Sequence, residues 1–455
     1  MENKKYLKWY QKVAYGSGDM GANFMYGLVS SFIMLYVTTA MGMNPAIIGT
    51  LMMVSKILDG VSDVFFGGLI DKTHSKMGKA RPWMFWSAFP LAICEVLLFS
   101  IPNAAPTLQY VYFFVIYTLL NAGLYTANNI AYASLTALIT KNPSERVQLG
   151  SIRFIFALVT NILISSITVM LVNSFGGGAA GWRMVAIIYA VLVIAFNMLA
   201  VLPVKEVPEE ENAAEKQQAA ASVDKRSLLE NLKLLIHNKF YLLILAYYIL
   251  YYCMSGISTG VGTFYCTYSL GNSELLGLLS MAGMGPMIIG LIVTPVLVSK
   301  FGIYKVNFVG MAIATVASIP TVIFGYTGNL AMFMVFSLIR GLGSSPMLGT
   351  LNAVIAETAT YSYNKDGVHL DGTMFSCSSM GIKVGGGVGT ALTGWLLALG
   401  GFDGEAVVQT AGAISMINFM YLVLPTVLTA IMLLIVFKLD VEKANKQLVA
   451  AKQHT

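Results

Sequence analysis

Long apolar runs recur along the whole chain and constrain its fold more than any other feature. The 455 residues are 56% hydrophobic and only 11% charged, and the mean hydropathy is +0.71. A helix of about 20 apolar residues spans a bilayer, whereas soluble domains contain roughly a quarter charged residues. The pattern predicts an all-α membrane protein with twelve transmembrane helices, at residues 13–40, 44–71, 82–102, 108–139, 148–174, 183–203, 240–268, 273–298, 304–327, 330–360, 372–400 and 411–438.

Lysine and arginine gather in alternate connections between these runs. They precede the first run and follow the even-numbered runs, while the odd-numbered connections contain Arg183 as their one basic residue. The positive-inside rule then predicts that both termini and all even-numbered connections are cytoplasmic, in a cytoplasmic (inner) membrane. This bias accounts for the net charge of +6, which therefore does not indicate nucleic-acid binding. The charged opening segment is unlike a cleavable signal peptide.

A polar segment divides the chain into two halves. Residues 204–238, rich in charge and alanine, predict a cytoplasmic linker between an N-terminal six-helix bundle, 1–203, and a C-terminal six-helix bundle with its tail, 239–455. The sequence repeats weakly across this linker, and the matched pairs are Tyr36 with Tyr265, Gly42 with Gly271, Gly49 with Gly277 and Lys72 with Lys300. Such a repeat is typical of transporters built from two similar halves.

Two aspartates, Asp59 and Asp63, lie one helical turn apart inside the second run, and Lys56 lies three residues before the first of them. A charged side chain at the centre of a membrane helix costs about 2.5–3.5 kcal/mol, and such residues usually mark ion or substrate pathways. Because two carboxylates on one face repel each other, the pair predicts a cation site. The structural alternative is that Lys56 neutralises one carboxylate and the other reaches water. In the second half of the repeat, Met287 and Leu291 stand at the positions that match Asp59 and Asp63. The predicted cation site therefore belongs to the N-terminal half.

Further polar side chains fall inside the predicted helices. They are Asp19, Asn23, Asn128, Asn129 and Arg153 in the first half, and Arg340 and Lys383 in the second. Amides donate and accept hydrogen bonds, as sugar hydroxyls do, and Tyr125 and Tyr132 offer aromatic faces. These residues predict a cavity for a neutral polyhydroxylated ligand, with Asn129 as a ligand-binding amide. The alternative is that the two adjacent asparagines only bond helices together.

Cysteine and histidine give no indication of a metal site or a cofactor. The four cysteines fall in apolar runs and the four histidines in connections or the tail, without metal-ligand spacing. No nucleophile elbow or phosphate loop is present, so an enzyme is the least favoured class. The expected partners are a small ligand and membrane lipid. The sequence does not set the oligomeric state, and a monomer is compatible with it.

Five segments resemble the glycoside–pentoside–hexuronide:cation symporters, the melibiose permease-like branch of the major facilitator superfamily. They are YGSGDMGANFMYG, KILDGVSDVFFGGLIDKTHSKMGKARPW, YTANNIAYASL, IRFIFA and DGTMFSCSSMGIK. The resemblance covers nearly the whole chain, and the second segment is the most specific. It implies the major facilitator fold and the uptake of a sugar together with Na⁺ or H⁺.

Carried over by position, the resemblance implies roles for individual residues. Asp59 and Asp63 would hold the cation, with further oxygens from Ser62 and Thr126 and charge balance from Lys56. The sugar-binding residues would be Asn23, Tyr125, Asn129, Arg153 and Lys383. In melibiose permease two of these positions are aspartates, and Ala22 and Ala133 replace a lysine and a tryptophan. Because this chain keeps the basic residues Arg153 and Lys383 but has asparagines in place of two acids, the resemblance predicts a cavity with more positive charge. Such a cavity would accept a uronate or a larger neutral glycoside.

A basic loop follows the second run and resembles the facilitator loop between spans two and three. Asp71 and Arg81 in this loop, with Arg146 and Glu357, are predicted to form ion pairs of a cytoplasmic gate. The alternative is a solvated charge run that only fixes topology.

These observations together predict a twelve-helix symporter that moves a glycoside, pentoside or hexuronide by alternating access, with Na⁺ slightly favoured over H⁺. Two alternatives stay open: cation-coupled transport of a lysolipid or drug, and a membrane receptor that binds sugar without moving it. The repeat and the paired acids argue against the receptor.

Overall fold

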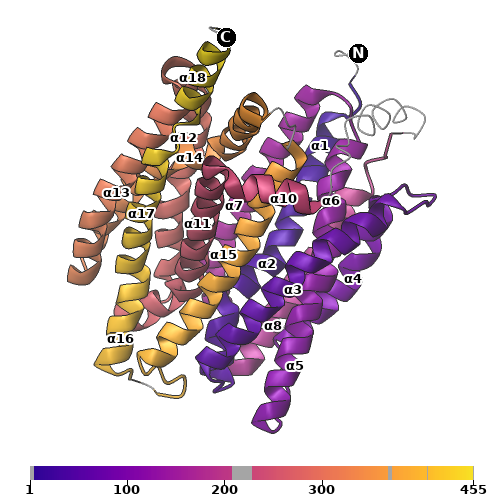
Figure 1. Ribbon diagram of the computed structural model, residues 1–455. Coiled ribbons are helices and arrows are strands. Elements are labelled where there is room, and N and C mark those ends of the chain that lie inside the picture. The colour runs from indigo at the N-terminus through magenta and orange to yellow at the C-terminus, as the bar shows by residue number, and fades with distance from the viewer. Residues whose placement is uncertain (1–4, 208–227, 367–370, 407, 454–455) are drawn as a thin grey trace. The chain divides into compact units, whose positions relative to one another are not determined.

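The computed structural model describes residues 5–207, 228–366, 371–406 and 408–453, and this part of the chain is helical, without strands (Figure 1). In chain order, with π-helical segments labelled η, the elements are α1 (Trp9–Gly16), α2 (Gly18–Leu35), η1 (Tyr36–Ala40), α3 (Pro45–Asp71), α4 (Arg81–Leu98), α5 (Pro106–Thr118), η2 (Leu119–Tyr125), α6 (Thr126–Leu138), α7 (Pro143–Ser174), α8 (Gly178–Val201), α10 (Leu228–His237), α11 (Lys239–Phe264), η3 (Tyr265–Ser269), α12 (Leu275–Phe301), α13 (Ile303–Thr327), α14 (Leu330–Asp366), α15 (Asp371–Leu399), α16 (Ala411–Asn418), η4 (Phe419–Val423), α17 (Leu424–Lys438) and α18 (Val441–Gln453).

Ten helical stretches in the described part of the chain are long and apolar enough to cross a membrane. Two helices that the sequence also predicts to span, α3 and α4, are not among the ten. Helix α3 contains three charged residues, Lys56, Asp59 and Asp63, near its middle. The protein is therefore an all-α multi-pass membrane protein, and the count of twelve spans stays a prediction.

The helices form two compact units. Unit 1 comprises Met1–Ser222, Gly262–Gly277 and Thr390–Ala413, and unit 2 comprises Val223–Val261, Leu278–Gly389 and Ile414–Thr455. These boundaries differ from the predicted halves, because the second half of the chain contributes two segments to unit 1. The predicted linker 204–238 also contains a helix, α10, at its end.

Close backbone contacts explain why unit 1 includes residues 390–413. A Cβ atom on Gly394 would lie 2.2 Å from the carbonyl oxygen of Pro45 and 2.9 Å from the Cα of Gly49. Beside this contact, the Trp395 indole N–H donates to the Thr50 hydroxyl at 2.9 Å. The start of α3 and the end of α15 therefore pack directly against each other, at a distance that only glycine permits.

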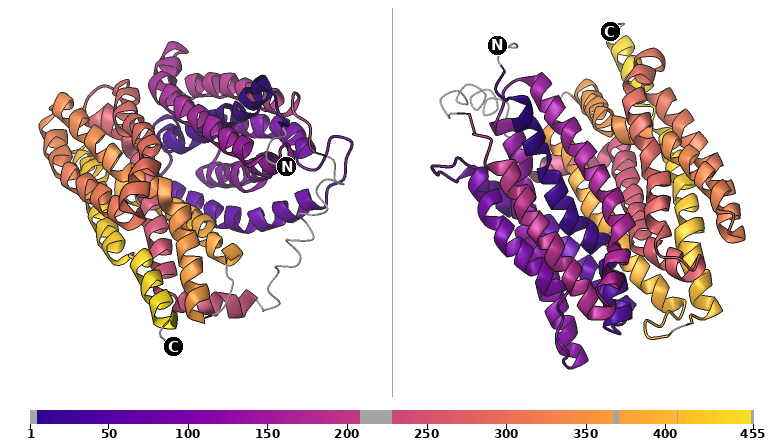
Figure 2. Two further views of the ribbon diagram at one scale, coloured as in Figure 1. Left: turned by 90° about the horizontal axis from the view of Figure 1, so that it is seen from above. Right: turned by 180° about the vertical axis from the view of Figure 1, so that it is seen from behind.

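Unit 1 is a helix bundle around α8, and the left view of Figure 2 shows the molecule from above. Helices α2 and α4 both pack along α8, and α3 packs against η2 and α6. Aromatic side chains fill the core of the bundle; for example, the rings of Phe24 and Tyr189 lie 5.1 Å apart. The bundle places the polar segments of α2, α3, η2 and α6 in one compact unit.

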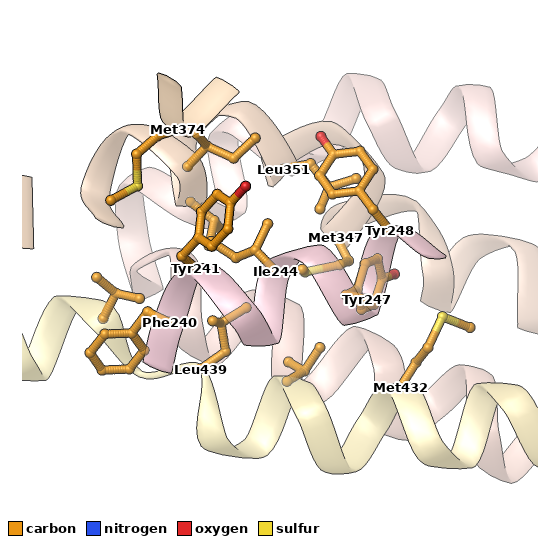
Figure 3. Packing of buried hydrophobic residues seen from close by; sticks show 14 of the residues in the cluster. Phe240, Tyr241, Ile244, Tyr247, Tyr248, Met347, Leu351, Met374, Met432 and Leu439 are labelled. Carbon is orange, nitrogen blue, oxygen red and sulfur yellow. The ribbon is translucent and has the colours of Figure 1, made fainter. Parts of the chain in front are cut away.

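In unit 2, an apolar cluster packs around the first turns of α11. Phe240, Tyr241, Ile244, Tyr247 and Tyr248 project from this helix toward α14, α15 and α17 (Figure 3). Helix α13 packs along α14 and α17 in the same unit. This core is apolar and aromatic, which fits a supporting role rather than a polar site.

The internal repeat predicted from sequence has structural counterparts. The π-helical segments η1 and η3 begin at the matched residues Tyr36 and Tyr265. Each is followed by a glycine with positive φ, 63° at Gly42 and 68° at Gly271. Because positive φ strains other residues, glycine is needed at the same point of both repeats.

A second counterpart is a carboxylate that caps a helix in each unit. Glu206, after α8, accepts hydrogen bonds from the backbone N–H groups of Lys79, Ala80 and Arg81 at 2.7, 2.9 and 3.0 Å. Glu442, in α18, accepts from the N–H groups of Ile303 and Tyr304 at 3.1 and 3.2 Å. Both carboxylates thus satisfy orphan donors at a helix N-terminus, where the helix dipole also favours negative charge.

Candidate functional site

The carboxylates of the predicted cation site are carried by α3. The helix begins at Pro45 with Asn44 as its N-cap, whose side-chain oxygen accepts from the N–H groups of Ala46 and Ile47. Asp59 and Asp63 lie four residues apart, so both project from one helix face. Asp59 is buried, with 8% of its surface exposed, and Asp63 is partly buried. The structure therefore keeps two acids on adjacent turns of a helix that the sequence predicts to span the membrane.

Thr126 lies directly beside Asp59. Its hydroxyl donates a hydrogen bond to the Asp59 carboxylate, and it also lies 2.9 Å from the backbone oxygen of Asn121. A hydroxyl has one proton, so it donates to one of these oxygens at a time. The π-helical segment η2 ends at Tyr125, immediately before Thr126. Segments of π-helix occur often at functional sites. This one contains Asn121 and leads directly into Thr126, so it positions these two residues.

Ser62 forms a hydrogen bond within its own helix. Its hydroxyl donates to the backbone oxygen of Asp59 at 2.9 Å, within α3 itself. The hydroxyl oxygen keeps its lone pairs and can still accept or ligate. Its role as a cation ligand stays a prediction.

Lys56 contributes the positive charge of this group. It interacts electrostatically with Asp59 and Asp63, and its ammonium nitrogen lies 5.3 Å from the centre of the Tyr26 ring. The two carboxylates lie on adjacent turns of one helix and repel each other, and both interact with Lys56. A monovalent cation bound between the two carboxylates would reduce their repulsion. Among the described residues, no group of three or more histidines, cysteines or acids could hold a metal ion otherwise.

Tyr26 links the acids to the predicted sugar residues, although the sequence did not single it out. Its ring stacks on that of Tyr125, with centroids 5.6 Å apart and planes 19° from parallel. Tyr26 therefore lies between Lys56 of the ion site and Tyr125 of the predicted sugar site. Its signal in the sequence is only a tyrosine in the YGSGDMGANFMYG segment, three residues after Asn23.

Asn23 lies in a chain of amide hydrogen bonds between α2 and α7. Its side-chain N–H donates to the backbone oxygen of Asp19 at 2.7 Å, and its side-chain oxygen accepts from Asn161 at 2.9 Å. The amide is only part-buried. Asn161 is thus a further polar residue of this region that the sequence reasoning did not name.

Arg153 is paired with an acid. Its guanidinium donates to both carboxylate oxygens of Asp19, at 2.6 and 3.4 Å, and lies 3.9 Å from the centre of the Tyr132 ring. The Tyr132 hydroxyl donates to the backbone oxygen of Tyr15 at 2.7 Å. The expected excess of positive charge at Arg153 is therefore offset by Asp19, an acid that the sequence reasoning placed in the first helix without assigning it this partner.

The adjacent asparagines Asn128 and Asn129 have different surroundings. Asn128 is buried and its amide N–H group lies within hydrogen-bond distance of Met84, Ser87 and Asn197. Asn129 is half-buried within α6, and its side-chain amide has no hydrogen bond to the side chains or backbone of the described residues. Asn128 thus bonds α6 to its neighbours, which leaves Asn129 as the amide available to a ligand.

Lys383 belongs to unit 2 and lies in α15, where it is partly buried. The other predicted sugar residues belong to unit 1. Whether Lys383 contributes to the sugar site stays a prediction.

The predicted gate residues bond mainly to backbone and amide groups. Arg81 donates to the carbonyl of Val201 at 3.2 Å, and Arg146 donates to the carbonyl of Thr140 at 3.0 Å. Glu357 accepts from the Asn445 amide at 3.0 Å. The side chain of Asp71 is not among those that the structure describes, so the ion pair predicted for Asp71 lies outside the described residues. The gate stays a prediction for all four residues.

Glu145 is an anchoring acid that the sequence reasoning missed. It forms an ion pair with Lys12 at 2.9 Å and accepts hydrogen bonds from the Thr140 hydroxyl and the Tyr6 N–H. Desolvation alone would raise the pKa of this carboxyl, but the bonds from Thr140, Lys12 and Tyr6 outweigh it and hold the pKa below its usual value. The charged N-terminal segment is therefore attached to the start of α7.

Comparison with known proteins gives consistent matches over nearly the full length. Residues 14–443 match the family described as MFS/sugar transport protein. The isoprimeverose transporter of Lactiplantibacillus pentosus is 31% identical, covering 96% of this chain and 90% of the relative. A putative glycoside/cation symporter of Escherichia coli (strain K12) is 27% identical, covering 96% and 94%. The crystal structure of a D-xylose–proton symporter has the same fold, with a TM-score of 0.62 and 13% identity over 93% of this chain and 95% of that one.

Proposed function

Because the chain belongs to the MFS/sugar transport protein family, we propose that it moves a neutral glycoside across the cytoplasmic membrane together with a cation, by alternating access. Family and relatives are sugar transporters and symporters rather than enzymes. The observation that carries the proposal is the continuous group in unit 1 that runs from Asp59 and Asp63 through Lys56 and Tyr26 to Tyr125.

Coupling follows from the charges of this group. Without a cation, the two carboxylates repel each other and compete for Lys56, which is held against the ring of Tyr26. A bound cation removes the repulsion and fixes the position of Lys56, and with it the ring pair Tyr26–Tyr125. If this raises sugar affinity by some factor, sugar raises cation affinity by the same factor, because linkage is reciprocal.

We propose Na⁺ as the coupling ion. The carboxylates of Asp59 and Asp63 with the hydroxyls of Thr126 and Ser62 offer several hard oxygen ligands. Protonation of one carboxylate would also relieve the repulsion, so H⁺ is the alternative. Uptake that depends on the proton gradient and not on Na⁺ would overturn the choice of ion and leave symport standing.

The pairing of Arg153 with Asp19 supports an uncharged substrate. A guanidinium that already donates to both oxygens of a carboxylate has less charge to offer to a uronate. The half-buried amides of Asn23 and Asn129 and the tyrosine face suit hydroxyl groups and sugar C–H surfaces. This favours the neutral glycoside over the hexuronide.

The test is uptake of radiolabelled glycosides and their uronate counterparts into membrane vesicles, with and without a Na⁺ gradient. We expect a neutral glycoside to accumulate only when Na⁺ is driven inward. A lysolipid or drug carried in its place would support the amphiphile alternative, and sodium-dependent sugar binding without uptake would support the receptor. In the same assay, Asp19→Asn should release Arg153 and shift selectivity toward the uronate, and an unchanged ratio would contradict the neutral-substrate proposal.

A further inference from the structure

Glu95 is a buried acid that neither the proposed sugar site nor the ion site uses. It lies in α4 on the same face as Ser87 and Leu91, which are spaced by four residues, and α4 packs along α8. Glu95 is 0% exposed, and neither of its carboxyl oxygens has a hydrogen-bond partner among the described residues. Buried carboxylates in folded proteins are paired or hydrogen-bonded, because an isolated buried charge loses its hydration without replacement.

The groups around α4 provide no charge to balance an ionised Glu95. The ionisable residues on the elements packed against α4 are Tyr110, Tyr112 and Tyr117 on α5, Tyr125 on η2, Tyr132 on α6, and Arg183 and Tyr189 on α8. Arg183 is exposed at the start of α8 and forms no ion pair with Glu95. Tyr189 is the neighbour that interacts electrostatically with Glu95.

The hydrogen bonds of Tyr189 show that it cannot donate to Glu95. The Thr168 hydroxyl lies 2.6 Å from the backbone oxygen of Ile164, a group that can only accept, so the single Thr168 proton is used there. The Tyr189 hydroxyl lies 2.8 Å from the same Thr168 oxygen and therefore donates its own proton to it. The Tyr189 hydroxyl oxygen therefore has only lone pairs left for its other neighbours, and it can act toward them only as a hydrogen-bond acceptor. Tyr189 therefore has no proton to offer to an ionised Glu95, and no other described group donates a hydrogen bond to the Glu95 carboxyl oxygens.

We propose that Glu95 binds a proton and keeps it at neutral pH, as a proton site separate from the Asp59–Asp63 pair. An ionised Glu95 would require water or a cation to enter the contact between α4 and α8. The proton is therefore a structural component of unit 1, held throughout the transport cycle rather than exchanged in it. Glu95→Gln keeps the size and polarity of the protonated acid and should leave sodium-driven uptake within about twofold of the wild type.

Infrared spectroscopy of the purified protein in lipid tests the protonation directly. The wild type at neutral pH should show the C=O stretch of a protonated carboxyl, and this band should shift when the protein is made with side-chain ¹³C-labelled glutamate. Glu95→Gln should abolish the band, and Glu405→Gln, at an exposed glutamate, should leave it unchanged. The double variant Asp59→Asn/Asp63→Asn should retain it. A wild type without a glutamate band, or a band that Glu95→Gln leaves intact, would overturn the proposal.

Thermal unfolding as a function of pH supplies a second readout. A free glutamate loses its proton above about pH 4.3, so unfolding at neutral pH would release the proton that Glu95 holds. The unfolding equilibrium then increases about tenfold per pH unit for one proton, and stability falls as pH rises. Glu95→Gln should remove this part of the slope and raise the melting temperature at alkaline pH. Loss of gradient-driven uptake in a folded Glu95→Gln protein would instead place Glu95 in the coupling machinery and contradict a retained proton.

Discussion

Asp59 and Asp63 are two like charges beside Lys56, and we expect their mutual repulsion to make the site responsive to a cation. The Thr126 hydroxyl offers one proton to the Asp59 carboxylate, which stabilises the charge without neutralising it. In a partly dry site, Coulomb interactions are several times stronger than in water. A change of one charge at this point should therefore alter the arrangement of the neighbouring tyrosines.

Replacing either acid by its amide should abolish accumulation of sugar. In Asp59→Asn or Asp63→Asn the repulsion between two carboxylates is absent, so cation binding no longer relieves it. Concentrative uptake should fall to background, while downhill exchange or binding of sugar persists. Vesicle uptake with and without a gradient measures both quantities. A variant that still accumulates sugar at the wild-type level would show that its carboxylate is not the coupling group.

The two adjacent asparagines give a matched pair of variants. Asn129→Ala should weaken sugar affinity by tens of fold, because a ligand hydroxyl left unpaired costs about 1–3 kcal/mol, and cation binding should be nearly unchanged. Asn128→Ala should leave affinity intact and lower stability by a similar amount, since its amide bonds α6 to Ser87 and Asn197. Equilibrium binding and thermal unfolding separate the two effects. The reverse result would exchange the two roles.

At the residue scale, candidate site residues were predictable where the sequence places a charged side chain in an apolar run, as at Asp59, Asp63 and Arg153. The side chains with which these residues pair in the fold were not predictable. Asp19 and Arg153 are 134 positions apart and meet only because α1, α2 and α7 pack together in unit 1. The sequence predicts an unbalanced positive charge at Arg153, whereas the structure shows Arg153 in an ion pair with Asp19.

At the scale of elements, the two capping carboxylates explain how each unit holds its basic loop. Glu206 satisfies three orphan N–H groups at the start of α4, and a Cβ on Gly78 would lie 2.4 Å from its carboxyl carbon. Gly78 has a φ of +105°, and Gly302, beside Glu442, has a φ of +84°. Glycine at these positions permits both the backbone conformation and the approach of the carboxylate.

Removal of either carboxylate should destabilise the helix that it caps. We expect Glu206→Ala to lower stability by about 0.5–2 kcal/mol, the usual cost of losing an N-cap, and Glu442→Ala to have a similar or smaller effect, with two bonds in place of three. Glu405→Ala, at an exposed position, is the control. Thermal unfolding of the purified variants measures the difference. Unchanged stability in both variants would mean that water replaces the carboxylate at no cost.

At the scale of the whole molecule, helical periodicity and the repeat predicted the fold class, and the π-helical and glycine counterparts support the repeat. The π-helical segments themselves were not predictable, because nothing in a local sequence such as LLNAGLY separates them from α-helix. The assignment of residues 390–413 to unit 1 was also not predictable from the sequence, because it depends on contacts between glycines that are far apart in the chain.

The contact of Gly394 with Gly49 gives a prediction for the transport cycle. The positive-inside rule predicts that the start of α3 lies on the non-cytoplasmic side, and alternating access requires the helices there to separate and close again. Gly394→Val should prevent closure, because its Cβ would lie 2.2 Å from the Pro45 carbonyl. We expect sugar binding from outside to survive while uptake is lost.

Gly386→Val on the same helix is the matched control, since a Cβ there meets nothing within 4 Å. It should transport at a rate near that of the wild type, after correction for the small change in helix propensity. The measurements are binding to right-side-out vesicles and uptake into them. Normal uptake by Gly394→Val would show that this contact can relax without cost and that closure does not depend on it. Equal loss in both variants would trace the effect to the valine itself rather than to the glycine contact.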